Sequence, residues 1–275
     1  MPLTVPAHPV FPRLLAPDDA ELADQLGAAV VHRETVHSWP LSWVERVRLA
    51  DGRTYACKTQ LPPTVEPEFY ARARSPLLPA YVRVTAGTIA LDWIEAPLLA
   101  TVRDTGELLA HGRAVVGEIA RLPADLPTYL DIAGEAAWRN EVEWALEGLA
   151  TFARVDPVAV DGLRTWAAQP EVLRLIDGPA RLVHGDLTPH QVFLTSDGYR
   201  VIDWQRPVRG PSEVDLVALL VHSGVDPAPH LDPAAIGIHW LLLLHWAVRG
   251  DRDVAPGLPL FRAWVKAAVV HILAV

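Results

Sequence analysis

The chain has 275 residues, of which 51% are hydrophobic and 21% are charged, a balance that favours a buried core and excludes wholesale disorder. The formal net charge is −9 and no segment concentrates Lys and Arg, which argues against nucleic acid or an anionic membrane as a partner. Cys57 is the only cysteine, so a disulfide scaffold and a cysteine-based zinc site are excluded.

No targeting or membrane segment is expected. The N-terminal residues show no basic segment followed by an apolar one, which a signal peptide would require. The longest apolar run, residues 236–248, is thirteen residues long and contains two histidines. That length is too short to span a bilayer and indicates a buried helix. We therefore expect a cytoplasmic protein, in keeping with its single cysteine.

The N-terminal third of the sequence predicts a helix and a small antiparallel sheet. Acids in the first turn and Gly27 at the end predict a helix over 16–27. Apolar residues then recur with a period near two, and an Ala-Asp-Gly turn separates two of the segments. The predicted strands are 28–37, 43–52, 53–60 and two more within 80–94. Thr64 is placed to cap a further helix at 65–74.

After Pro97 the apolar spacing becomes helical, at 105–122, at 135–154 and from Ser212 onward. A hairpin over 192–202 interrupts these helices. The pattern predicts an α+β fold with an antiparallel sheet lobe at 1–95 and a larger, mainly helical lobe at 96–275.

Two aspartates flank the predicted hairpin. Asp186 precedes its first strand, Asp203 follows its second, and Gln191 stands at its start. Because a hairpin brings its ends together, we expect the two carboxylates to lie near each other. One acid can hold a divalent cation while the other orients a hydroxyl group, a division of roles that suits phosphoryl transfer. Mg²⁺ prefers such carboxylate and amide oxygens.

The segment "HGDLTPHQ" at 184–191, followed by "VIDW" at 201–204, resembles the aminoglycoside phosphotransferase and choline kinase family. The resemblance implies a bilobal protein-kinase-like fold, ATP or GTP as phosphate donor, Mg²⁺, and a small-molecule hydroxyl as acceptor. Eleven residues separate Asp203 from Asp215, which leaves little room for the long activation loop of protein kinases. This spacing favours a small-molecule acceptor over a peptide.

The same resemblance implies roles for residues of the first lobe, which would bind the nucleotide. Lys58, in "TYACK", would bind the ATP phosphates. Glu66 would pair with Lys58, with Glu68 as the alternative. Backbone groups near Trp93 and Ile94 would hold the adenine, and those around Ser38 would cover the phosphates.

The second lobe would supply the catalytic loop and the acceptor site. Asp186 would act as general base or orient the acceptor hydroxyl, while Asp203 and Gln191 would hold the metal. His184 is expected to pack beneath the loop and Asp215 to brace it. The family has Asn where this chain has Gln191, so altered metal binding or lowered activity is expected.

Three alternatives stay open at this point. The chain could be a nucleotide-binding pseudokinase, with Gln191 marking weakened metal binding, or a nucleotidyl transferase that uses the same pocket. A third ambiguity concerns acids on the 135–154 helix. They form either a solvated face or a carboxylate wall for a cationic substrate; these acids are Glu135, Glu141, Glu143 and Glu147.

Overall fold

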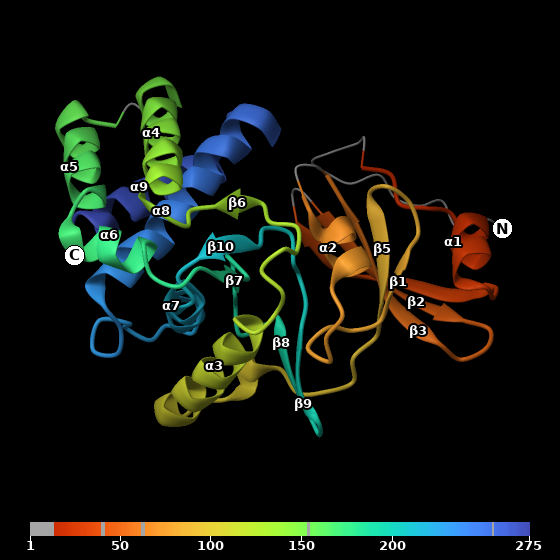
Figure 1. Ribbon diagram of the computed structural model, residues 1–275. Coiled ribbons are helices and arrows are strands. Elements are labelled where there is room, and N and C mark those ends of the chain that lie inside the picture. Colours follow the sequence, from red (N-terminus) through yellow and green to blue (C-terminus); the bar gives the residue numbers. More distant parts are fainter. Residues whose placement is uncertain (1–13, 40–41, 62–63, 153–154, 255) are drawn as a thin grey trace. The chain divides into compact units, whose positions relative to one another are not determined.

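The computed structural model in Figure 1 describes residues 14–39, 42–61, 64–152, 155–254 and 256–275. The chain divides into two compact units. Unit 1 consists of Met1–Pro97 and Phe193–Gln205, and unit 2 of Leu98–Val192 and Arg206–Val275. Unit 1 therefore recruits a second, distant segment, which the sequence analysis had placed with the C-terminal lobe.

Unit 1 is built on a five-stranded antiparallel sheet with the order β1-β2-β3-β5-β4. The strands are β1 (Val30–Trp39), β2 (Ser42–Leu49), β3 (Thr54–Gln60), β4 (Tyr81–Arg83) and β5 (Thr88–Asp92). The central strand, β3, places Lys58 opposite Val44 of β2 and Ile89 of β5. Cys57 points to the core beneath the sheet, with Leu22 and Val47. Lys58 lies next to it on the same strand, so its side chain belongs to the other face.

Two helices accompany this sheet. Helix α1 (Asp19–Leu26) begins at Asp18, whose carboxylate accepts bonds from the backbone N–H groups of Ala20 and Glu21. It ends at Gly27 with φ of 77°, the left-handed conformation that favours glycine at this position. Helix α2 (Glu66–Arg72) is shorter than predicted, and Thr64 accepts a hydrogen bond from the N–H of Glu66.

The predicted hairpin is present as β8 (Val192–Thr195) and β9 (Gly198–Val201). Backbone hydrogen bonds join it to the rest of unit 1, from Leu194 to Pro97 at 2.8 Å and from Val201 to Leu77 at 2.7 Å. These bonds explain why the hairpin belongs with the sheet although the helical sequence surrounds it.

Unit 2 is mainly helical. Its helices are α3 (Thr105–Ile119), α4 (Glu135–Phe152), α5 (Pro157–Ala167), α6 (Pro170–Ile176), α7 (Glu213–His222), α8 (Pro233–Arg249) and α9 (Pro259–Ile272), with a 3₁₀ turn η1 (Leu99–Thr101) and a π-helical turn η2 (Gly250–Val254). Helices α4 and α9 both pack on α8 (Figure 1). The apolar run 236–248 lies in α8 and is buried almost throughout, as predicted. At Gly148 of α4 an added Cβ would lie 2.2 Å from Val248, so only glycine permits this approach to α8.

A three-stranded sheet with the order β6-β10-β7 lies within unit 2. Its strands are β6 (Leu130–Asp131), β10 (Val208–Gly210) and β7 (Arg181–Val183). Strands this short give little periodicity, and the sequence analysis did not predict β6 or β10. Strand β7 leads directly into His184-Gly185-Asp186, so the small sheet positions the predicted catalytic loop.

The structure confirms the α+β class, with an antiparallel sheet in the N-terminal region and helices dominating the rest. None of the described helices combines the length and the apolar character that crossing a membrane would require.

Candidate active site

An ion cluster forms in unit 1 around the buried Lys58. Its Nζ lies 2.8 Å from Oε2 of Glu66, at the start of α2, and also contacts Asp203, which follows β9. Glu66 is fully buried. Burial alone would lower the pKa of Lys58, but the nearby carboxylates of Asp203 and Glu66 raise it above the usual value. The ammonium group therefore remains charged between two acids.

Glu66, and not the alternative Glu68, is the partner of Lys58. Glu68 is half exposed and pairs with Arg83 at 3.0 Å. The two acids are two residues apart on α2 and point in different directions, as helical geometry requires.

The backbone around Asp203 directs its carboxylate toward Lys58. Asp203 has φ of 74°. Among the described residues, no other non-glycine residue has a positive φ. This conformation is unfavourable for most side chains and recurs at functional sites. The next residue, Trp204, is fully buried and stacks on Phe69 of α2 at 4.4 Å between ring centroids. Gln205 then donates a hydrogen bond to Gln60 of β3. These contacts on the C-terminal side hold the strained residue in place.

In unit 2, Asp215 at the start of α7 holds the loop that carries Asp186. Its carboxylate accepts hydrogen bonds from the backbone N–H of His184 at 2.7 Å and of Gly185 at 3.0 Å. Burial raises the pKa of Asp215 to about 7, although the two backbone hydrogen bonds act in the opposite direction. His184 is fully buried, as expected of a residue packed beneath the loop.

Gly185 is required by the backbone geometry of this loop. Its φ is 82°, and an added Cβ would lie 2.3 Å from the carbonyl oxygen of Arg206. Any larger residue would push β7 and the segment before β10 apart.

Asp186 forms an ion pair with Arg206 within unit 2. The guanidinium carbon of Arg206 also lies 4.3 Å from the ring centroid of Trp246 on α8. Arg206 is not among the site residues predicted from the sequence. A usable signal would have been the antiparallel ladder that pairs Val208 with Val183, since two steps further along it Arg206 stands opposite Gly185. Finding it required prediction of the three-residue strand β10.

Gln191 is buried, and its amide oxygen accepts a hydrogen bond from the N–H of Thr188 at 2.7 Å. An amide oxygen has two lone pairs and can accept from more than one partner. Asp203 and Gln191 offer the hard oxygens that Mg²⁺ takes. Within the described residues, no group of three or more His, Cys, Asp or Glu side chains could enclose a metal. A cation held by one or two protein oxygens and by phosphates needs no such enclosure, and its joint binding by Asp203 of unit 1 and Gln191 of unit 2 stays a prediction.

The predicted nucleotide-binding backbone is only partly free to bind. The N–H of Trp93 donates to the carbonyl of Thr54, and the indole N–H donates to Glu95. The adenine contact expected near Ile94 stays a prediction. Ser38 lies at the end of β1, opposite Trp43. Pro40 and Leu41, in the predicted phosphate-covering segment, lie outside the described residues.

The structure thus brings Lys58, Glu66 and Asp203 together in unit 1, and His184, Asp186 and Asp215 in unit 2. The expected convergence of Asp186 and Asp203 joins the two units and stays a prediction.

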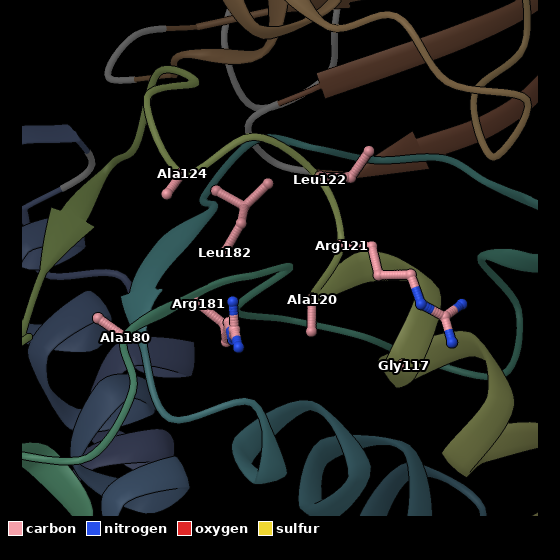
Figure 2. Close-up of a pocket in the computed structure, with 8 residues that line it drawn as sticks. All are labelled: Gly117, Ala120, Arg121, Leu122, Ala124, Ala180, Arg181 and Leu182. Atoms are coloured by element: carbon pink, nitrogen blue, oxygen red, sulfur yellow. The ribbon is translucent and has the colours of Figure 1, made fainter.

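A hollow of about 430 Å³ lies elsewhere in unit 2, at the end of α3 and the start of β7 (Figure 2). Gly117, Arg121, Arg181 and Leu182 help to line it, and the two arginines stand on either side of Ala120 in Figure 2. None of the candidate site residues lines this hollow. It adds nothing to the predicted chemistry.

Comparison with known proteins agrees with this geometry. The model of the phosphotransferase enzyme family APH matches residues 21–249. A sequence search of curated proteins finds no match.

Similar solved structures have low sequence identity but high coverage. A macrolide 2′-phosphotransferase from Brachybacterium faecium is 18% identical, with 92% of this chain and 95% of that chain covered and a TM-score of 0.63. A choline/ethanolamine kinase family protein from Mesorhizobium loti is 15% identical, with 89% and 87% covered and a TM-score of 0.63. A thermostable mutant of aminoglycoside phosphotransferase APH(4)-Ia, in ternary complex with AMP-PNP and hygromycin B, is 15% identical, with 93% and 97% covered and a TM-score of 0.60. These likenesses confirm the bilobal kinase-like fold.

Because the family model covers most of the sequence, and the sheet and helices match the fold of these enzymes, the chain belongs to the phosphotransferase enzyme family.

Proposed function

We propose that this protein is a small-molecule kinase that transfers the γ-phosphate of ATP to a hydroxyl group. The observation that carries the proposal is the ion cluster of the buried Lys58 and Glu66 with Asp203 in a member of a phosphotransferase family. A charged amine held between two acids is suited to bind phosphate oxygens. A similar structure, that of APH(4)-Ia, is a complex with an ATP analogue, which supports ATP as the donor.

We assign nucleotide binding to the sheet-containing unit. Lys58, positioned by Glu66, would contact the α- and β-phosphates. The backbone at Ile94 would bind the adenine, with Trp93 beside it, and the N–H groups around Ser38 would cover the phosphates. ATP as donor agrees with action in the cytoplasm.

We assign magnesium to Asp203 and Gln191. When bound, the cation would neutralise charge on the phosphates as the transfer proceeds. The remaining steps belong to the protein's own side chains. Lys58 would bind the phosphates. The contacts of Trp204 with Phe69 and of Gln205 with Gln60 keep the Asp203 carboxylate directed toward Lys58.

Asp186 would orient the acceptor hydroxyl and accept its proton. Asp215 fixes the backbone of the loop, and Arg206 fixes the carboxylate of Asp186. Binding one oxygen of Asp186 leaves the other for the acceptor.

The acceptor is a hydroxylated small molecule. Similar structures include enzymes named for macrolides and aminoglycosides, and one contains hygromycin B, so antibiotics are one class to test. A resistance role would follow only from phosphorylation of such a compound.

The test is ATP turnover with Mg²⁺ or Mn²⁺ across a panel of antibiotics, amino alcohols, sugars and nucleosides, with GTP as a second donor. We expect phosphate transfer to at least one acceptor, identified by mass spectrometry. Tight ATP binding without turnover on any acceptor would instead indicate a pseudokinase. A product carrying an adenylyl group would indicate a nucleotidyl transferase.

A further inference from the structure

A series of stacked arginine and aromatic side chains begins at Asp186 in unit 2. We call it the arginine–aromatic wall. Its members are Arg206, Trp246, Tyr129, Arg249, Trp144 and Arg252. They come from the segment before β6, from α4, from α8 with the turn η2 that follows it, and from the segment before β10.

The first part of the wall is contiguous with the predicted catalytic carboxylate. Arg206 pairs with Asp186 and stacks on Trp246. Trp246 meets Tyr129 edge to face, with 5.8 Å between ring centroids. Arg249 lies over Tyr129 at 4.8 Å. Two guanidinium groups are thus fixed on aromatic faces, that of Arg206 in contact with Asp186 and that of Arg249 two rings further along.

The second part continues along η2. Arg252 lies 4.6 Å from the ring centroid of Trp144 on α4. Asp253 binds Arg252 at 2.7 Å and lies 3.9 Å from Arg249. Along the wall, three arginines (Arg206, Arg249 and Arg252) are accompanied by two aspartates, Asp186 and Asp253. One of these aspartates, Asp186, is the proposed base.

Three of the four acids of α4 contact side chains that are not members of the wall. Glu141 pairs with His245 at 2.9 Å, and Glu143 pairs with Arg164 at 2.9 Å. Glu135 pairs with Arg139. Three of the four acids that could have formed a carboxylate wall for a cation are therefore engaged within the protein.

Arg206 retains hydrogen-bonding capacity. A guanidinium group has five N–H donors in a planar fork. In the part of the chain that the structure describes, Asp186 is the hydrogen-bond acceptor of Arg206. Stacking restricts the guanidinium, so less conformational entropy is lost when a second oxyanion binds.

An acceptor whose hydroxyl reaches Asp186 brings its own substituents within range of Arg206. Resting on the proposed function, we propose that the arginine–aromatic wall selects an acceptor that carries an oxyanion group, a carboxylate or a phosphate, near its reactive hydroxyl. An ammonium group in that position would meet a fixed like charge. A carboxylate or phosphate matches the guanidinium fork in two hydrogen bonds.

A matched series of ligands tests this selection. Gluconate, sorbitol and glucamine share one polyhydroxy chain and differ at the terminal group, which is a carboxylate, a hydroxyl or an amine. Sorbitol 6-phosphate adds the phosphate form, and hygromycin B adds a cationic antibiotic. Binding to the full-length protein with AMP-PNP present is measured by titration calorimetry. We expect an anionic member to bind about tenfold more tightly than sorbitol, with the amines weakest.

Variants locate the selection in the wall. In Arg249→Gln, which keeps Arg206, the anion preference should fall from about tenfold to about threefold while sorbitol binding is unchanged. Arg249→Lys retains the positive charge and should keep part of the anion preference. That result would show that the loss in Arg249→Gln comes from the missing charge and not from misfolding. Arg209→Gln is the matched control, because Arg209 on β10 pairs with Asp131 outside the wall. This control should keep the full preference.

Tightest binding of an amine, equal or undetectable binding of the series, or equal loss for all ligands in Arg249→Gln would overturn the proposal. The test does not depend on turnover. Anion selection without phosphate transfer would refute the kinase function and leave the selection standing. Turnover with cationic acceptors alone would support the kinase function and refute the anion selection.

Discussion

The two predicted halves of the active site are held together by different means. In unit 1, Lys58 sits between two carboxylates; Lys58 and Glu66 are buried, while 33% of the Asp203 side chain is exposed. In unit 2, Asp186 pairs with one arginine that rests on an indole ring, and both side chains keep some exposure. The first arrangement suits a group common to all reactions of the family, a nucleotide phosphate. The second leaves an open side for an acceptor that differs between relatives.

The sharpest test of this contrast is Lys58→Met. Removing the amine leaves Glu66 as an uncompensated buried charge, so we expect a loss of about 3–5 kcal/mol in the free energy of unfolding. Urea denaturation measures it. The matched control is Arg83→Met, whose exposed pair with Glu68 should be worth about 1 kcal/mol or less. Similar losses in both variants would mean that the pair of Lys58 and Glu66 is not desolvated.

The pH dependence of stability tests how the loop in unit 2 is held. The pKa of Asp215 is raised to about 7 in the folded protein, so the folded state binds its proton more tightly than the unfolded state does. Its contribution is complete below pH 4 and is lost as the pH rises through 7. This loss is on the order of 4 kcal/mol. Asp215→Asn should remove that slope in denaturation curves between pH 4 and 8, and an unchanged slope would refute the assignment.

The variant Asp186→Asn tests whether catalysis by unit 2 can be separated from nucleotide binding by unit 1. Turnover should fall by roughly a hundredfold or more, because the positioned base is lost. Affinity for AMP-PNP, which we assign to unit 1, should change little. Asp197→Asn, in the hairpin turn where Asp197 pairs with Arg200, is the control and should leave both quantities unchanged. Equal losses of turnover and nucleotide affinity in Asp186→Asn would contradict the separate roles.

The smallest effect is expected for Gln191→Asn, which restores the residue usual in the family. Turnover should rise or stay within about threefold, since the amide oxygen is retained. Steady-state kinetics over a range of Mg²⁺ concentrations measures the change. Complete inactivation would show that the amide of Gln191 serves to accept the hydrogen bond from Thr188 and does not serve to bind the metal.

Motif residues with a fixed local order could be predicted from the sequence. Lys58 on a strand, Glu66 at a helix start and Asp203 after a hairpin follow from periodicity, turn residues and resemblance. Arg206 could not be predicted, because its pairing with Asp186 depends on β10 and on the packing of α8. The assignment of the hairpin to unit 1 was also missed, since it depends on backbone hydrogen bonds to Pro97 and Leu77. Long-range pairing between short strands leaves almost no trace in local sequence.

Cys57 has a practical consequence. Burial raises the pKa of its thiol to about 12, so the nucleophilic thiolate is scarce at neutral pH. A cysteine introduced at an exposed position such as Ser196 would therefore be the one thiol to react with a maleimide dye. The natural sequence thus already serves as a clean background for site-specific fluorescent labelling, without prior removal of its own cysteine.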